Sequence, residues 1–226
     1  MSEAATRFVL EPEAARLLSE YGIPYPEHGV AHSADEAVQL AESLGYPVVL
    51  KAVSLDVVHK SDVGGVAVGL EDASEVRTAY ERMVDQVQAA VPKAQIEGVL
   101  VCKQAAEGLE VIVGALDDHT FGPTVMFGLG GVFTEVLKDT TFRVAPLERS
   151  DAEEMVEEIQ GYPLLSGERG QAAHDLNAVA DLLLSVSRMI VDHPEIKELD
   201  LNPVRVYEQG VLVLDARLLE RVGQAP

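Results

Sequence analysis

The 226-residue chain has a single cysteine, Cys102, and no tryptophan. One cysteine excludes an internal disulfide framework and a zinc site built on cysteine thiolates. No apolar run approaches the roughly 20 residues of a membrane span, and the first residues, MSEAATRF, contain no apolar segment of the signal-peptide type. These absences predict a reduced, soluble, cytoplasmic protein that has no membrane partner.

Positive charge is also scarce. Seventeen basic residues stand against 38 acidic ones, the formal net charge is −21, and lysine is scarcer than arginine. A surface of this kind repels nucleic acid and anionic membranes, so we expect neither as a partner. It also suits a salt-rich cytoplasm, where screening weakens self-repulsion. The composition therefore favours a halophilic source, with an ordinary acidic protein as the alternative.

The chain is long enough, and at 47% hydrophobic apolar enough, to bury one sizeable core or two coupled lobes. It has no internal repeat, low-complexity tract or long linker. Hydrophobic periodicity and the helix-capping residues Ser33, Asp72 and Ser150 predict an α+β fold. Helices are expected over 11–21, 33–45, 72–91, 150–161 and 175–192, and apolar strand segments over 48–50, 66–70, 98–102, 111–116, 125–132, 134–138, 142–147, 198–207 and 211–214.

The stretch VVLKAVSLDVVHKSDVGGV, residues 48–66, is the first candidate site. Lys51 follows three strand-forming residues, so we expect it at a strand end, where its ammonium could bind a phosphate oxygen. Gly64 and Gly65 would let backbone amides approach the same anion. The alternatives are a solvated lysine and an ordinary hairpin turn.

His59 lies in the polar loop between Lys51 and the glycine pair. A lone loop histidine is most often a surface residue. In a phosphate-binding loop, however, imidazole is a competent phosphoryl acceptor near neutral pH, because part of it is unprotonated. Further along, Glu110 begins a strand and could bind ribose hydroxyls, while the backbone from Cys102 to Ala106, which includes Ala105, could read the adenine edge. Taken alone, Glu110 would be a surface glutamate.

The C-terminal hairpin carries oxygen ligands. Asp200 and Asn202 alternate with leucines and so share one face of a strand. Asp215 ends the partner strand and is expected close by. Such side chains suit Mg²⁺ that also binds nucleotide phosphates, with water completing the shell. The alternative is a capped strand end with Asn202-Pro203 as a turn.

Together these residues resemble the ATP-grasp fold, in which nucleotide binds between two α+β lobes. The segments HKSDVGGV, FGPTVMFGLGGVFTEVLKDTTFRVAPL and ELDLNPV resemble, more specifically, the β subunit of ADP-forming acyl-CoA synthetases (acetate–CoA ligase), relatives of succinyl-CoA synthetase. The resemblance covers the chain from about Leu10 to Leu218. It implies a small lobe over residues 27–103 and a large lobe from residues 1–26 and 104–226.

The family implies a phosphoryl relay. A partner α subunit, with CoA-binding and ligase domains, would convert acyl-CoA and phosphate to an acyl phosphate and pass the phosphoryl group through its own histidine to a histidine of the β subunit. That residue matches His59, which then delivers the group to ADP. Lys51 and Glu110 match nucleotide-binding residues, and Asn202 and Asp215 match the magnesium ligands.

Asp200 stands where related synthetases have a glutamate that steadies the phosphohistidine, and an α₂β₂ assembly is expected. Cys102 departs from the glutamate or glutamine common at the adenine hinge, which leaves nucleotide preference open. Two alternatives have different tests. Turnover by the chain alone would indicate a stand-alone carboxylate–amine ligase, and failure to bind nucleotide would indicate a regulatory synthetase-like module.

Overall fold

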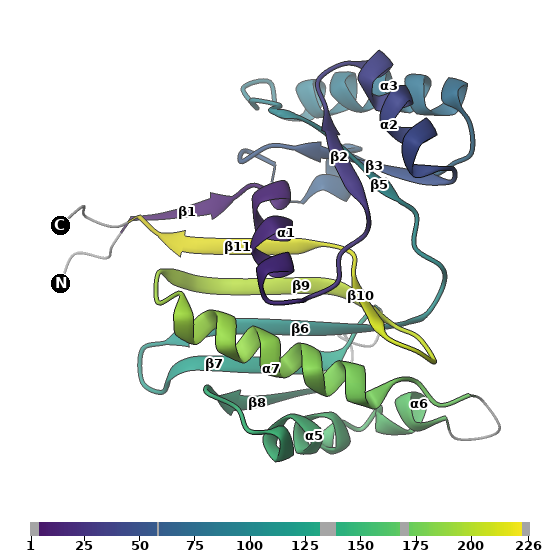
Figure 1. Ribbon diagram of the computed structural model, residues 1–226. Helices are drawn as coiled ribbons and strands as arrows, with labels where there is room; N and C mark the ends of the chain where they lie inside the picture. Colours follow the sequence, from purple (N-terminus) through teal and green to yellow (C-terminus); the bar gives the residue numbers. More distant parts are fainter. Residues whose placement is uncertain (1–4, 58, 132–138, 168–171, 223–226) are drawn as a thin grey trace. The chain divides into compact units, whose positions relative to one another are not determined.

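The structure, a computed structural model, describes residues 5–57, 59–131, 139–167 and 172–222 (Figure 1). Contacts divide the chain into a larger unit, Met1–Tyr25 with Glu107–Pro226, and a smaller unit, Pro26–Ala106. The sequence places these breaks after residues 26 and 103. No helix among the described residues is long and apolar enough to cross a membrane.

The smaller unit is an antiparallel four-stranded sheet with two helices on one face (Figure 1). Val48, Leu50 and Ala52 of the third strand are at most 1% exposed and pack with the helices. The strand order is β2 (His28–Ala31), β5 (Gly98–Lys103), β3 (Val48–Val53), β4 (Val66–Leu70); the helices are α2 (Ala34–Leu44) and α3 (Ala73–Ala90), and a 3₁₀ helix, η1 (Lys60–Val63), precedes β4.

The predicted caps explain where these helices begin. The Ser33 hydroxyl accepts from the Glu36 amide at 3.2 Å, whereas the Glu36 carboxylate accepts from the His32 amide at 2.8 Å, one residue before the position a capping box requires. The Asp72 carboxylate accepts two amides of the first turn of α3. Gly45, at φ 78°, ends α2 in a backbone conformation that favours glycine.

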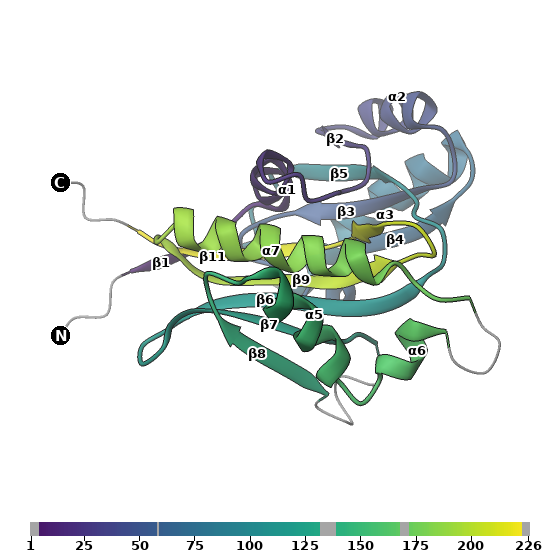
Figure 2. The ribbon, with the colours of Figure 1, turned by 60° about the horizontal axis from the view of Figure 1, so that its bottom comes forward.

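The larger unit is built on a seven-stranded sheet with helices against one face (Figure 2). Six strands follow the order β1-β11-β9-β6-β7-β8, and β10 pairs with β9. The strands are β1 (Thr6–Val9), β6 (Leu109–Asp118), β7 (Gly122–Leu129), β8 (Thr140–Val144), β9 (Ile196–Val206), β10 (Val211–Val213) and β11 (Ala216–Arg221); the helices are α1 (Glu11–Glu20), α5 (Arg149–Glu158), α6 (Tyr162–Ser166) and α7 (Leu176–Asp192).

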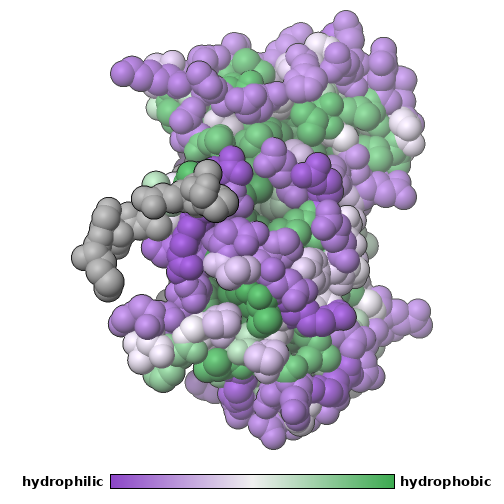
Figure 3. Space-filling model, turned by 60° about the vertical axis from the view of Figure 1, so that its left-hand side comes forward, coloured by the Kyte–Doolittle hydropathy of each residue, from purple (hydrophilic) through white to green (hydrophobic). Residues whose placement is uncertain are grey.

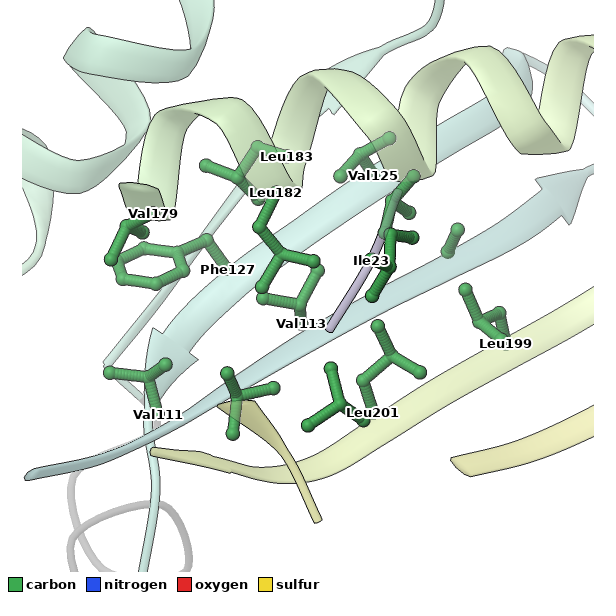
Figure 4. Packing of buried hydrophobic residues seen from close by; sticks show 14 of the residues in the cluster. Ile23, Val111, Val113, Val125, Phe127, Val179, Leu182, Leu183, Leu199 and Leu201 are labelled. Atoms are coloured by element: carbon green, nitrogen blue, oxygen red, sulfur yellow. The ribbon is translucent and has the colours of Figure 1, made fainter. Parts of the chain in front are cut away.

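Alternation along the central strands assigns each side chain to a face. Val111, Val113, Phe127 and Leu201 are fully buried and pack under α7 (Figure 4). The residues between these positions therefore point to the opposite face of the sheet, which we call the open face. Asp200 lies on it.

Most predicted elements are confirmed, with three corrections. β3 continues through Lys51 to Val53. α5 begins at Arg149 and is capped reciprocally by Glu148 and Asp151, so the predicted cap at Ser150 is wrong, and it ends at Glu158. β1, β2, β11 and α6 were not predicted, and β1 pairs with β11. The segment predicted over 134–138 lies outside the described residues.

Candidate functional site

Lys51 lies within a strand and not at its end. It stands opposite Val66 of β4 and Leu100 of β5, and only 8% of it is exposed. Its neighbours Leu50 and Ala52 pack toward the helices, so Lys51 points to the other face of the small sheet. The prediction failed because an internal strand position was read as too apolar for a charge, yet a long apolar stem lets lysine occupy one.

The segment between Lys51 and the glycine pair is tied down at both ends. Val57 is buried, and the Asp56 carboxylate accepts from the Gln95 amide at 2.8 Å. Beyond the exposed His59, the chain forms η1 and returns to β4. The segment thus presents the exposed His59 imidazole between two anchored ends. A side chain that carries a chemical group must be exposed in this way to reach its reaction partners.

The glycine pair has a structural role that the sequence did not predict. Gly64 adopts φ 72°, and its amide donates to Ser61 O at 3.3 Å. The Gly65 amide donates to Lys60 O at 2.7 Å, and a Cβ on Gly65 would lie 3.0 Å from that same oxygen. In this conformation both amides close the turn after His59, so the pair does not present free N–H groups to an anion.

Cys102 and Ala105 lie where β5 leads out of the smaller unit. Cys102 is 3% exposed and stands opposite His28 and Val49. Lys103, which the sequence did not single out, donates from Nζ to the carbonyls of Gly45 and Tyr46 at 2.6 and 3.0 Å. Its charge therefore serves the turn after α2.

Glu110 is paired, which the sequence also missed. It stands opposite Arg205 of β9, whose Nε and Nη2 donate to the Glu110 carboxylate at 3.4 and 3.3 Å. A carboxylate has room for further donors, so the arginine can fix the orientation of Glu110 while leaving capacity for hydroxyl groups. Arg205 alternates with buried valines on β9, which places it on the open face but does not identify its partner.

Asp200 lies in the middle of the open face. Its register partners are Gly114 of β6 and Arg217 of β11. Burial raises the pKa of the Asp200 carboxyl, with nearby Glu198 adding to the rise and Arg217 opposing it. A Cβ on Gly114 would lie 3.1 Å from Met126 Cε, so the glycine accommodates the Met126 side chain. The site therefore presents a partly desolvated carboxyl on the open face.

Asn202 and Asp215 are brought together by the backbone. The Asn202 amide donates to Asp215 O at 3.2 Å, and one Asp215 carboxylate oxygen accepts from the Ala216 amide at 3.0 Å. No group of three His, Cys, Asp or Glu side chains that could hold a metal occurs in the described part of the chain. The oxygen donors of these two residues fit Mg²⁺ that takes its remaining ligands from phosphate and water.

Among the described hollows, one of about 690 Å³ lies between β4 and α3. It includes Gly64 but none of the other predicted site residues. The candidate residues thus divide between the two units: Lys51, His59, Gly64, Gly65, Cys102 and Ala105 in the smaller, and Glu110, Asp200, Asn202 and Asp215 in the larger.

The comparisons with known proteins agree with this arrangement. A family model described as an ATP-grasp domain matches residues 1–219, so fold and sequence together define an ATP-grasp protein. The β subunit of acetate–CoA ligase (ADP-forming) I from Pyrococcus furiosus is 44% identical over 218 residues, which cover 96% of this chain and 94% of the relative. The chain belongs to this family of ligase β subunits.

Acetate–CoA ligase (ADP-forming) I of Archaeoglobus fulgidus is 50% identical over 211 residues, 93% of this chain but 31% of the relative. The chain thus spans about a third of that relative's length.

Among solved structures, dinucleotide forming acetyl-coenzyme A synthetase 1 of Ca. Korarchaeum cryptofilum, in complex with coenzyme A, Ca-AMPCP and HgCl⁺, superposes with a TM-score of 0.93 at 50% identity, covering 95% of this chain and 94% of that chain. Another structure of that enzyme contains Mg-AMPPCP, with its phosphohistidine segment pointing towards the nucleotide binding site; its TM-score is 0.83 at 46% identity, covering 95% and 93% of the two chains.

Proposed function

We propose that this chain binds ADP or ATP with Mg²⁺ and is the nucleotide-binding part of an ADP-forming acyl-CoA synthetase. The overall reaction converts acyl-CoA, ADP and phosphate to a carboxylic acid, ATP and CoA. The observation that carries the proposal is Lys51, a lysine held 8% exposed inside a strand. A lysine ammonium binds a phosphate oxygen as a point charge, and a nucleotide phosphate is the anion that the family membership supplies.

In the proposed reaction, an unprotonated nitrogen of His59 attacks the phosphoryl group carried by a histidine of the partner α subunit. A P–N bond forms on His59 as the partner's P–N bond breaks. A β-phosphate oxygen of ADP then attacks the same phosphorus, and the electron pair of the breaking P–N bond returns to His59. Lys51 neutralises phosphate charge, and Arg205 holds Glu110 toward the ribose. Asn202 and Asp215 would hold Mg²⁺, which neutralises further phosphate charge.

Asp200 would accept a hydrogen bond from the imidazole nitrogen that does not carry phosphorus. Its half-buried position on the open face supports this role, because a partly desolvated carboxylate makes a stronger hydrogen bond than one in water.

Phosphoryl labelling tests the proposal. The chain, mixed with its α subunit, acyl-CoA and labelled phosphate, should carry acid-labile label on His59. His59→Ala should abolish this label and ATP formation, while His119→Ala, a change at an equally exposed loop histidine, should leave both intact. Full labelling of the His59→Ala chain would overturn the carrier role. ATP-dependent turnover without the α subunit would favour the stand-alone ligase instead.

We also infer an α₂β₂ assembly and a cytoplasm rich in salt. The separate β subunit among the relatives supports a partner chain, and sedimentation of the reconstituted complex tests the stoichiometry. The net charge of −21 supports the salt-rich setting.

A further inference from the structure

One part of the larger unit departs from the acidic character of the chain. No acidic residue lies between Asp118 and Glu135 or between Asp139 and Glu148, although the chain has 38 acidic residues in 226. These two stretches supply β7 and β8, and β8 is the last strand in the order of the large sheet. Figure 3 shows a face on which hydrophilic residues predominate and hydrophobic residues form smaller groups. The open face at this end of the sheet therefore carries no acidic side chain from β7 or β8.

The open face of β8 is apolar and exposed. Thr141 donates from its hydroxyl to Met155 O of α5 at 2.9 Å, and Arg143 pairs with Glu158 of the same helix. Phe142 and Val144 alternate with these two residues, so they point to the other face, where they are 47% and 51% exposed.

Neighbouring residues extend this area. Met126 of β7 is the register partner of Phe142, and Thr124 that of Val144. We call these residues the β8 patch: Thr124, Met126, Phe142 and Val144.

Among the described strands, β8 ends the sheet. Soluble proteins usually protect an edge strand that has exposed aromatic and β-branched side chains and no lysine, proline or acid. A low content of acidic residues with exposed aromatics is instead typical of the centre of a protein interface. The patch therefore has the composition of a surface that another protein covers.

The patch is continuous with the candidate catalytic residues. Register partners run from Asp200 to Gly114, from Gly114 to Met126, and from Met126 to Phe142, so all four lie in one row on the open face. The next row, from Glu198 through Leu116 and Thr124 to Val144, lies on the side of Asp200 away from Asn202. A partner protein bound to the patch would contact the row that contains Asp200 and would leave the proposed metal ligands, Asn202 and Asp215, uncovered.

We propose that the β8 patch is the surface on which the α-type partner docks, an inference that rests on the proposed function. The Archaeoglobus relative contains a further two thirds of chain beyond the part that matches, so a large partner body exists in the family. A second copy of this chain is disfavoured, because two chains of net charge −21 repel each other. The docking surface of the partner should accordingly be apolar and free of acidic clusters.

Charge substitutions on the patch test this assignment. The chain is combined with the α subunit of the same organism, recognised by its similarity to the unmatched part of the Archaeoglobus relative. Phe142→Lys and Val144→Lys should each weaken the association at least tenfold, measured by sedimentation velocity over a concentration series. Val191→Lys is the matched control, because Val191 is 42% exposed on α7, and it should leave the association within twofold.

Two further measurements make the outcome decisive. Phe142→Thr and Val144→Thr remove apolar surface but keep strand propensity, so they should fold normally and weaken association to a lesser degree. The isolated variants should bind Mg-ADP as the unsubstituted chain does. Loss of ADP binding by the unsubstituted chain itself would count against the proposed function and not against the patch.

Association of both lysine variants within twofold of the unsubstituted chain would overturn the proposal. So would a concentration-dependent dimer of the isolated chain that Phe142→Lys dissociates, because a second copy would then be the occupant.

Discussion

Two lysines of the smaller unit allow a paired test of what each charge does. Lys51 is buried within β3 and faces away from the helices, whereas Lys103 donates from Nζ to two backbone carbonyls near the end of α2. Substitution by methionine keeps the apolar stem of either side chain and removes its ammonium. We expect the Lys51 variant to lose affinity for Mg-ADP and the Lys103 variant to lose stability.

For Lys51→Met, losing one charge-assisted contact to phosphate should cost about 1.5–3 kcal/mol, which is about 10- to 150-fold in the dissociation constant of Mg-ADP. The free energy of unfolding should change by less than about 1.5 kcal/mol, because methionine fills a similar volume and the desolvation cost of the ammonium is removed together with its contacts. For Lys103→Met, the unfolding free energy should fall by about 1–3 kcal/mol, because two hydrogen bonds from a charged and partly exposed donor are lost. The affinity for Mg-ADP should stay within about twofold of the unsubstituted chain.

Titration calorimetry with Mg-ADP gives the affinities. Urea unfolding gives the stabilities, followed by far-ultraviolet circular dichroism because the chain has no tryptophan. The reasoning is refuted if Lys51→Met binds Mg-ADP normally but unfolds far more easily, since Lys51 would then be a structural residue like Lys103.

Two further predictions concern charge and stability. Burial raises the pKa of the Asp200 carboxyl, so the folded chain binds the carboxyl proton more tightly than the unfolded chain does. The free energy of unfolding therefore falls as pH rises from the ordinary carboxyl pKa through the raised pKa, because the carboxyl loses its proton in the folded chain. Asp200→Asn should therefore gain stability relative to the unsubstituted chain between about pH 4 and pH 7, as urea midpoints across that range would show; a difference independent of pH would contradict this. Self-repulsion at a net charge of −21 should make the thermal midpoint rise with KCl from about 0.1 M to above 1 M, and a flat response would argue against a salt-adapted chain.

Local signals explain what the sequence could predict. Helix starts at Ser33 and Asp72 were found because one side chain near the backbone decides them. The facing of Asp200 on β9 follows from strict alternation with buried leucines. The family resemblance, which rests on contiguous motifs, is confirmed by the relatives.

Pairings between distant residues could not be predicted. The Glu110–Arg205 pair joins residues 95 positions apart, and β1 pairs with β11 from the opposite end of the chain. A short terminal strand such as Thr6–Val9 has no periodicity of its own, because its stability comes from its partner. The burial of Lys51 was missed for the same reason, since it depends on β4 and β5 on either side.

The pairing of β1 with β11 has a consequence for how the protein is made. The smaller unit is one continuous stretch, Pro26–Ala106, and all four of its strands are synthesised before β6, which follows β1 as the second strand of the larger unit. The larger unit begins with β1 but must wait for Ala216–Arg221, because Thr6 pairs with Arg221 and Val9 with Leu218. Until synthesis reaches that last strand, β1 has no strand to pair with. Synthesis therefore favours an order in which the unit that carries His59 folds first, and the sheet that carries Asp200 closes last.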